Sequence, residues 1–330
     1  MAAPDTRPDE FALIARLFAP LARDWPGAYG LVDDAATIAA PPGEELVVTK
    51  DLIVEGVHYL PDDPPDLVAR KLIRVNVSDL AAKGARPLAY LLGVVLPRRL
   101  TLDWLDGFAA GLKDDQARYG MSLIGGDTTA GEGPAVFSLT AFGTLPVGTI
   151  LRRGGARPGD RVYLSGTLGD AALGLKALKG ELPGLDADLR AALVGRYRLP
   201  KPRPELGVRL RGLAHAALDV SDGLIADLGH LCEVSKVGAE IEVASLPLSP
   251  AARSALAADR RLIEPVLTGG DDYEILFAAP PPAAGVIQLA ANAARVAVTA
   301  IGRIVEGQGV RALGPDGAPL AFGPGGYRHF

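Results

Sequence analysis

Two periodicities of hydrophobic positions run through the chain and predict its helices and strands. Apolar side chains that recur every three or four positions predict helices over residues 9–22, 66–83, 101–119, 170–178 and 224–237. Short apolar runs bounded by Gly, Pro or polar residues predict strands over residues 31–39, within 46–60, and over 88–96, 121–124, 135–145, 161–164, 214–220, 239–243, 273–277 and 296–304.

A segment rich in Gly and Arg, residues 146–158, separates two groups of these elements. A chain of 330 residues is long for a single hydrophobic core. We therefore predict a two-domain protein of the α+β or α/β class, with domains over residues 1–148 and 149–330. The C-terminal domain is expected to be α/β, with a mixed or antiparallel sheet.

The stretch 46–60 departs from a simple strand pattern, because Thr49, Lys50 and Asp51 interrupt its apolar run. Burying an unpaired charge costs several kcal/mol or more, so a carboxylate at Asp51 implies a cation beside it. That cation is either Lys50 or a metal ion. The alternative is a strand end that leads into an exposed turn.

Composition excludes several classes of function. The net charge of −5, the pI near 5.5 and the 5% aromatic content argue against a nucleic-acid or membrane-surface role. The single cysteine, Cys232, permits no internal disulfide and fits a reducing compartment. The N-terminal residues lack a charged flank followed by an apolar run, and no segment approaches the ~20 apolar residues of a membrane span. We expect a cytoplasmic protein without nucleic-acid or membrane partners.

Carboxylates recur at the ends of the predicted apolar elements. In the helix 66–83 the apolar stripe continues directly into Asp79. If these carboxylates converge they repel one another, so convergence implies Mg²⁺, which takes oxygen ligands and shares them with phosphates. Exposure of each carboxylate to solvent is the alternative. The acidic residues in question are Asp33, Asp34, Asp51, Asp79, Asp127, Asp219 and Asp222.

Two Gly-rich segments, 124–129 and 165–170, read as turns whose backbone N–H groups suit a phosphate. Neither is a Walker A loop, because no Gly-Lys-Ser/Thr follows. The four histidines lack the paired spacing of a zinc site. His58 differs from the others, since Gly56 allows a close approach and the ring is a donor for a phosphate oxygen. The alternative is a histidine at a strand end that binds nothing.

Taken in order, eight motifs closely resemble the thiamine-monophosphate kinases, a family of the aminoimidazole ribonucleotide synthetase superfamily. The resemblance covers residues 11–330. It implies conversion of thiamine monophosphate and ATP to thiamine diphosphate and ADP, with several Mg²⁺ ions, by direct in-line phosphoryl transfer. It also implies a homodimer whose N-terminal domains join their sheets, and a C-terminal domain that covers the nucleotide. The motifs are VDDAA, VTKDLIVEGVHYL, VNVSDLAAKGA, IGGDTT, RRGGARPGD, SGTLGDAALGL, LDVSDGLIADLGH and TGGDDYEILF.

The same resemblance implies roles for individual residues. The implied metal ligands are Asp34, Thr49, Lys50 through its carbonyl, Asp51, Asp79, Asp127, Asp219 and Asp222. The residues implied at ATP are Gly126, Asp127, Arg153 and Ser221. Those implied at thiamine monophosphate are His58, Asp271 and Tyr327, with Tyr327 over the thiamine ring and Asp271 near its cationic or amino portion. No covalent nucleophile is implied.

The chain departs from the family pattern at two positions. Val32 stands where the family usually has Gly before the Asp pair. Thr49-Lys50-Asp51 stands where the family usually has Ser-Thr-Asp or Thr-Thr-Asp, so Lys50 replaces a Thr. Lys50 either neutralises phosphate directly or points away while its carbonyl serves the metal. We favour the second arrangement, because the first sets a positive charge against Mg²⁺.

Two other functions compete with the kinase prediction. One is another ATP-dependent synthetase or kinase of the same superfamily. However, the chain lacks the N-terminal Cys or selenocysteine expected of selenophosphate synthetases and the C-terminal Cys of the hydrogenase-maturation relatives. The other is a non-catalytic protein that binds nucleotide or metal through its Asp residues, although no EF-hand spacing supports calcium.

Overall fold

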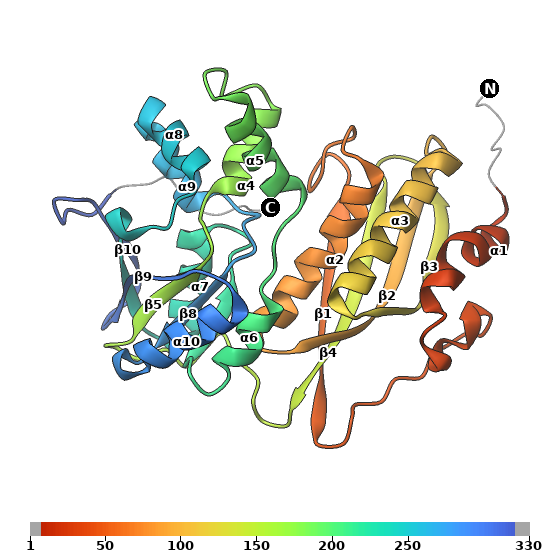
Figure 1. Cartoon of the computed structure of the whole chain (residues 1–330), viewed down its shortest axis with the longest axis horizontal. Coiled ribbons are helices and arrows are strands. Elements are labelled where there is room, and N and C mark those ends of the chain that lie inside the picture. Colours follow the sequence, from red (N-terminus) through yellow and green to blue (C-terminus); the bar gives the residue numbers. More distant parts are fainter. Residues whose placement is uncertain (1–7, 321–330) are drawn as a thin grey trace. The chain divides into compact units, whose positions relative to one another are not determined.

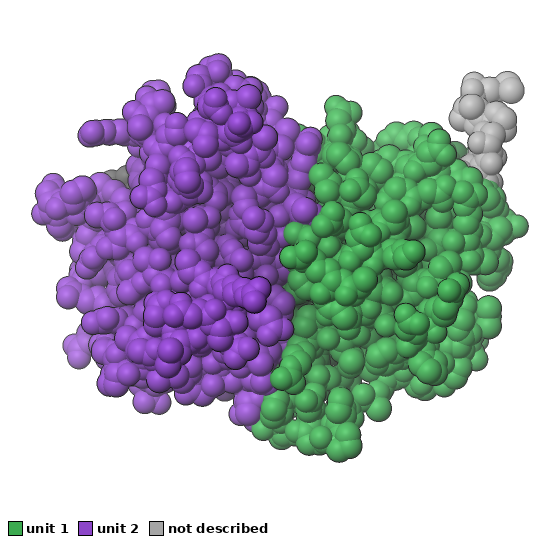
Figure 2. Space-filling view, viewed as in Figure 1, with its two compact units in different colours: residues 1–80, 86–147 green, residues 81–85, 148–330 purple. Residues whose placement is uncertain are grey.

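The computed structural model describes residues 8–320, which form two compact units. The first unit comprises Met1–Leu80 and Arg86–Val147, and the second comprises Ala81–Ala85 and Gly148–Phe330 (Figure 2). Each unit has its own sheet and its own helices, so the predicted two-domain architecture is confirmed.

The first unit is built on a four-stranded sheet of order β1-β4-β2-β3. β4 runs antiparallel to both of its neighbours, whereas β2 and β3 are parallel. Helices α2 and α3 cover one face of this sheet (Figure 1). The elements are β1 (Glu44–Val54), α2 (Pro65–Ala82), β2 (Arg86–Pro97), α3 (Leu102–Tyr119), β3 (Ser122–Gly131) and β4 (Val136–Pro146).

Aromatic stacking holds α3 on the sheet. The ring centroids of Phe108 on α3 and Phe137 on β4 are 4.4 Å apart, and Trp104 stacks on Phe137 at 5.9 Å. Side chains alternate along β1 as expected for a sheet covered on one face: Val47 and Ile53 are buried, whereas residues between them on the other side of the strand are exposed. This second face is called the open face below; the N-terminal segment packs over part of it, where Ala28 and Leu31 share a hydrophobic cluster with Leu91 and Phe142.

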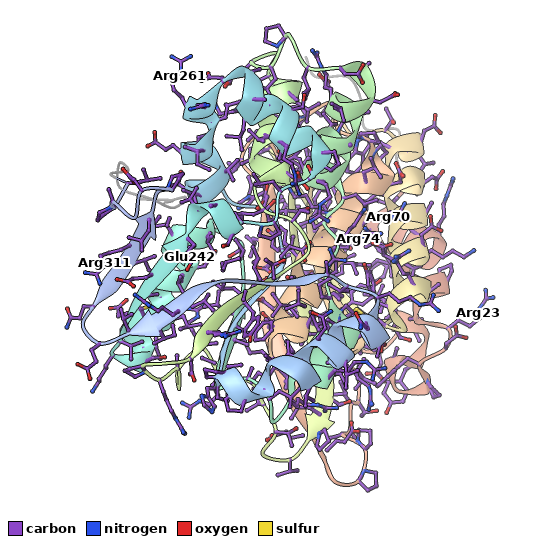
Figure 3. All side chains as sticks on the ribbon, turned by 60° about the vertical axis from the view of Figure 1, so that its left-hand side comes forward. Arg23, Arg70, Arg74, Glu242, Arg261 and Arg311 are labelled. Carbon is purple, nitrogen blue, oxygen red and sulfur yellow. The ribbon has the colours of Figure 1, made fainter. Side chains whose placement is uncertain are left out.

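A buried ion cluster also joins α2 to α3. The Asp115 carboxylate on α3 accepts hydrogen bonds from Arg74 at 2.5 and 3.1 Å and from Arg70 at 3.2 Å. Arg70 and Arg74 lie one turn apart on α2 (Figure 3). Because Asp115 and Arg74 are both buried, each depends on the other for charge compensation.

The N-terminal segment is helical but irregular, and one prediction there is wrong. Residues 9–22 form α1 (Glu10–Leu13), the π-helix η1 (Ile14–Phe18) and the 3₁₀ turn η2 (Ala19–Ala22), followed by η3 (Pro26–Leu31). Residues 31–39 were expected to be a strand, but they pair with no other strand. Tyr29, just before this segment, and Leu31, its first residue, adopt left-handed backbone conformations, and Thr37 N–H donates to the Gly27 carbonyl.

The segment 124–129, expected to be a turn, is instead part of the ten-residue strand β3. The reason lies on the neighbouring strand. A Cβ atom at Gly126 would sit 1.9 Å from the Leu92 carbonyl oxygen, so glycine is required where β3 passes β2. Gly126 therefore serves strand pairing.

The second unit has a six-stranded mixed sheet of order β10-β7-β9-β5-β8-β6, in which only β10 and β7 are parallel. Adjacent residues of one strand point into two cores: Leu164 packs with the larger core and Tyr163 with the smaller. The strands are β5 (Arg161–Ser165), β6 (Ala216–Asp219), β7 (Gly238–Glu242), β8 (Ile275–Ala279), β9 (Val298–Val305) and β10 (Gly309–Leu313).

Helices cover both faces of this sheet. The larger core packs against α4 (Asp170–Leu178), α5 (Ala187–Arg198), α7 (Leu224–Ser235), α8 (Pro250–Ala258) and α9 (Ile263–Thr268). The smaller core packs against α6 (Pro204–Leu210) and α10 (Ala284–Ala294). Short 3₁₀ turns occur at η4 (Val243–Ser245), η5 (Arg260–Leu262) and η6 (Pro281–Ala283). Between residues 8 and 320, no helix is long and apolar enough to cross a membrane.

Candidate functional site

Three of the predicted metal ligands lie together in the first unit. Thr49 Oγ1 on β1 donates a hydrogen bond to Asp79 Oδ2 at the C-terminal part of α2. Asp51 follows Thr49 by two residues, so both side chains project from the helix-covered face of β1. The apolar stripe of α2 thus ends in a carboxylate that meets a polar position of the strand.

The remaining predicted ligands of this unit line a cavity of about 550 Å³. Asp34, Lys50, Gly126 and Asp127 belong to its wall. Lys50 lies on the open face of β1, where its ammonium group donates to Ser138 Oγ on β4. The side chain of Lys50 therefore points away from the Thr49–Asp79 pair.

Sheet register explains why this cavity has room. Ser138 on β4 pairs with Gly93 on β2, and Gly93 pairs with Asp127 on β3. Because Gly93 has no side chain, nothing fills the sheet surface between Ser138 and Asp127 at this level. The residues that line this cavity include six with oxygen-bearing side chains and one lysine: Asp33, Asp34, Asp127, Thr128, Ser138, Thr140 and Lys50.

His58 sits in a tight turn after β1. Its Nδ1 atom accepts the Val54 N–H at 3.1 Å, so in the neutral ring the proton resides on Nε2. The backbone of the turn is fixed from α2, where the buried Lys71 donates to the His58 carbonyl at 2.9 Å. This arrangement makes Nε2 a donor of the kind that binds a phosphate oxygen.

In the second unit, the end of β6 carries the predicted ligands Asp219 and Asp222. The buried carboxylate of Asp227 on α7 accepts the N–H groups of Ser221 and Asp222 at 3.0 and 2.9 Å and so shapes the turn. Burial, followed by the negative charge of Asp219 and then that of Asp222, raises the pKa of Asp227 to about 8. Asp219 and Asp222 supply the negative charge at this turn, and their oxygen atoms suit a divalent cation.

The turn that carries Asp271 is bonded directly to this one. Asp271 N–H donates to the Ser221 carbonyl at 2.9 Å, and Tyr273 N–H donates to the Val220 carbonyl at 2.8 Å. A Cβ atom at Gly270 would sit 2.0 Å from the Ser221 oxygen, so only glycine permits this approach. The predicted nucleotide residue Ser221 and the predicted substrate residue Asp271 therefore lie in adjacent turns.

The exposed Arg153 lies beside the strand that carries Asp219. The preceding residue, Arg152, accepts the Ala217 N–H at 2.8 Å, which aligns the segment with β6. Ser235 fixes the following residues, because its hydroxyl accepts the N–H groups of Gly155 and Ala156. The structure thus gathers Arg153, Asp219, Ser221, Asp222 and Asp271 within one unit.

Two further predictions concern Tyr327 and the clustering of the metal ligands. Tyr327 lies outside the described residues 8–320. Within that range, no three His, Cys, Asp or Glu side chains approach closely enough to hold a metal ion. The Thr49–Asp79 hydroxyl–carboxylate pair and the negative turn at Asp219 nevertheless have the oxygen chemistry that Mg²⁺ prefers.

Sequence reasoning missed the residues that hold these turns in place. Lys71, Asp227, Asp272 and Glu274 are all buried, and each binds backbone or side-chain groups of a neighbouring turn. Their signal in the sequence is a charged residue within or beside an apolar run. That signal shows burial of a charge without indicating which distant group compensates it.

Family models match both parts of the chain. A model described as AIR synthase related protein, N-terminal domain, matches residues 32–145, and the corresponding C-terminal domain model matches residues 157–314. Among curated relatives, thiamine-monophosphate kinase of Caulobacter vibrioides (strain ATCC 19089 / CIP 103742 / CB 15) is 46% identical over 321 residues, which cover 96% of this chain and 90% of that protein.

Solved structures show the same similarity. Thiamine-monophosphate kinase from Stenotrophomonas maltophilia K279a superposes with a TM-score of 0.84 at 39% identity, covering 94% of this chain and 98% of that one. AaThiL complexed with AMPPCP and TMP superposes with a TM-score of 0.77 at 33% identity, covering 92% of this chain and 97% of that one.

Proposed function

The chain belongs to the thiamine-monophosphate kinase family of AIR synthase related proteins, and we propose that it transfers the γ-phosphoryl group of ATP to thiamine monophosphate. The products are thiamine diphosphate and ADP. The observation that carries this function is end-to-end similarity to a structure complexed with both an ATP analogue and TMP. The predicted two-domain fold and kinase activity agree with this similarity.

The reaction we propose is direct, in-line attack by a phosphate oxygen of thiamine monophosphate on the γ-phosphorus. Two anions must approach each other, so charge neutralisation and alignment supply most of the rate enhancement. At pH 7 the acceptor phosphate is largely ionised, with a second pKa of about 6, and needs no strong general base. His58 Nε2–H is proposed to donate to an oxygen of the acceptor phosphate.

Mg²⁺ is the proposed metal. Its ligands in the first unit are Asp34, Thr49, Lys50 through its carbonyl, Asp51, Asp79 and Asp127; those in the second unit are Asp219 and Asp222. When bound, the ion neutralises charge on the phosphate oxygens. Gly126, Asp127, Arg153 and Ser221 are the proposed ATP contacts, and His58, Asp271 and Tyr327 the proposed acceptor contacts.

A homodimer is part of the proposal, with the N-terminal domain, residues 1–148, as its interface. The open face of the first sheet supports a second copy as the partner. Val48 and Leu52 on the edge strand β1 are 56% and 46% exposed, although both are apolar. Replacing both with Asp is expected to convert a dimer into a monomer in light scattering. We place the reaction in the cytoplasm, where the free thiol of Cys232 stays reduced.

Measuring ADP release tests the function. Purified protein with ATP and Mg²⁺ is expected to release ADP only when thiamine monophosphate is present, and to form thiamine diphosphate in equal amount. Release of ADP without thiamine monophosphate, or no release at all, would defeat the proposal. Chelation of Mg²⁺ by EDTA is expected to stop the reaction, and its restoration by added Mg²⁺ tests the metal requirement.

A further inference from the structure

A buried cluster of charged residues lies directly beneath the turn that carries Asp271. The Glu274 carboxylate is fully buried and accepts hydrogen bonds from Arg203 at 2.5 and 2.7 Å and from Arg196 at 2.9 Å. The Ser165 hydroxyl also donates to it, at 2.6 Å. These four residues, here called the Glu274 cluster, come from segments that are distant in sequence.

Residues 271–274 alternate between two environments. Asp272 and Glu274 are buried, whereas Asp271 and Tyr273 are half-buried. The Asp272 carboxylate accepts the N–H groups of Gly169 and Ala171 at 2.5 and 3.1 Å, so it anchors the turn to the start of α4. The two buried carboxylates therefore hold the turn from the protein interior. Asp271 and Tyr273 lie on the partly exposed side of the turn.

The presented residues adopt an unfavourable backbone conformation. Asp271 and Tyr273 have φ angles of 74° and 52°, in the left-handed region. Each such residue costs of order 1–3 kcal/mol and persists only where the surroundings impose it. The hydrogen bonds to Asp272 and Glu274, together with the bonds from this turn to residues 220 and 221, impose it here.

The cluster is poorly suited to a purely stabilising role. Burying ion pairs is often no better for stability than packing hydrocarbon of the same volume. Moreover, Nη1 of the buried Arg196 has no hydrogen-bond partner among the described residues. Arg196 Nη2 also donates to the Asp272 carbonyl at 3.3 Å, so this arginine touches the backbone of the turn as well as Glu274. Positioning of the turn accounts for a network that stability alone does not favour.

We propose that the Glu274 cluster is a positioning device that holds Asp271 in its strained conformation and thereby sets the affinity for thiamine monophosphate. This inference rests on the proposed function, in which Asp271 contacts the acceptor. The proposed contact lies near the cationic or amino portion of the acceptor, away from the transferred phosphoryl group. An interaction made equally in the ground state and the transition state changes KM and leaves kcat unaltered.

Arg203→Met is the main test, because Arg203 retains partial solvent contact and Arg196 still pairs with Glu274. We expect KM for thiamine monophosphate to rise at least about tenfold, while kcat and KM for ATP change by less than about threefold. Arg203→Lys keeps the charge but loses the bidentate geometry, so its KM is expected to fall between those of the wild type and Arg203→Met.

Amide hydrogen exchange supplies a readout that does not depend on activity. The N–H groups of Asp271 and Tyr273 donate to residues 221 and 220, and their exchange is expected to accelerate in Arg203→Met by an order of magnitude or more. Exchange in the strands β7 and β10, at the far end of the sheet, is expected to stay unchanged. A variant with unchanged exchange at Asp271 and unchanged KM overturns the proposal, and so does a fall in kcat at constant KM.

Glu240 offers a matched control on the same sheet. It also pairs with two arginines, Arg303 at 2.6 Å and Arg311 at 2.7 Å, but the arginines are solvent-exposed and far from the turn in the sheet order (Figure 3 labels Arg311). Glu240→Gln is expected to leave both KM values unchanged. If wild-type protein fails to phosphorylate thiamine monophosphate, the proposed function fails, whereas the exchange result still decides whether the cluster positions the turn.

Discussion

The two units present their candidate ligands by different means. In the first unit, Thr49, Lys50 and Asp51 lie on a long strand, and alternation divides them between two faces of the sheet. In the second unit, Ser221, Asp222 and Asp271 lie in turns whose shape depends on buried carboxylates. A regular strand fixes side-chain direction through its own ladder, whereas a turn needs tertiary contacts. The same ligand chemistry therefore depends on local structure in one unit and on distant residues in the other.

The largest expected effect comes from the strand side of this comparison. Asp51→Asn is expected to lower kcat by about 10³-fold or more, since one metal ligand is worth several kcal/mol of transition-state stabilisation. The free energy of unfolding is expected to change by less than about 1 kcal/mol, because the β1 ladder holds the residue in place. Steady-state kinetics at saturating Mg²⁺ and urea unfolding measure the two quantities.

Glu44→Gln on the same strand is the matched control and is expected to retain full activity. Near-normal turnover of Asp51→Asn at saturating Mg²⁺ contradicts the metal assignment. A large loss of stability in the same variant would instead show that Asp51, like the ligands in the turns, depends on tertiary contacts.

Breaking the ion cluster between α2 and α3 tests the scaffold of the first unit. Asp115→Ala leaves the buried Arg74 without its carboxylate, and we expect a loss of about 3–5 kcal/mol in the free energy of unfolding. Urea denaturation followed by tryptophan fluorescence measures this loss. The double replacement Arg74→Met, Asp115→Leu is expected to recover most of it, and a double variant as unstable as the single one would refute the explanation.

The free energy of unfolding is expected to depend on pH through the buried Asp272, which holds one turn of the second unit. Burial raises the pKa of Asp272 to about 7, so between pH 4 and 7 the folded state holds a proton that the unfolded state releases. Raising the pH through this window therefore weakens folding, by at most about 1.4 kcal/mol per pH unit. Asp272→Asn is expected to remove this dependence, so the wild type loses stability relative to the variant from pH 4 to pH 7.

Thermal unfolding at several pH values measures that difference. Asp186→Asn is the control, since Asp186 also caps a helix but at the surface. A difference between wild type and Asp272→Asn that stays constant from pH 4 to pH 7 would show that Asp272 does not titrate in this window.

The smallest effect is expected at Lys50. Lys50 lines the same cavity as Asp127, but its ammonium group is held by Ser138 Oγ and lies on the face opposite the Thr49–Asp79 pair. Lys50→Met is therefore expected to change kcat and the Mg²⁺ concentration dependence by less than about fivefold. Titration of activity with Mg²⁺ measures both. A much larger loss would indicate that the ammonium group neutralises phosphate directly.

The features that the sequence predicted are those set by the periodicity of neighbouring residues along the chain. The stripe that ends in Asp79 correctly indicated a polar group on the buried side of a helix, and Thr49 meets it there. Gly126 was placed in a turn because a glycine pair looks the same in a turn and in a strand that passes close to another chain segment. The oxygen of Leu92 decides between the two, and it lies 34 positions away in sequence.

The ion pairs between residues far apart in the chain could not be predicted from the sequence for a related reason. Arg196 and Arg203 are 78 and 71 residues from Glu274, in a stretch that reads only as polar. Arg196 lies in α5 and Arg203 directly precedes α6, and both helices carry weak local signals in the sequence. Nothing in the composition specifies which carboxylate these arginines meet. The sequence therefore proposes candidate ligands, but it does not identify the residues that position their turns.

Gly126 has a consequence for how this enzyme tolerates change. The residue stands within the proposed ATP contacts, yet the reason for glycine is the Leu92 oxygen on the next strand. A randomised library spanning residues 125–129 would return glycine at position 126 under any selection, including one for a different phosphate donor. The choice of phosphate donor can be changed by substituting neighbouring residues but not by substituting Gly126. Its invariance in such an experiment would reflect the spacing of two strands and carry no information about the nucleotide.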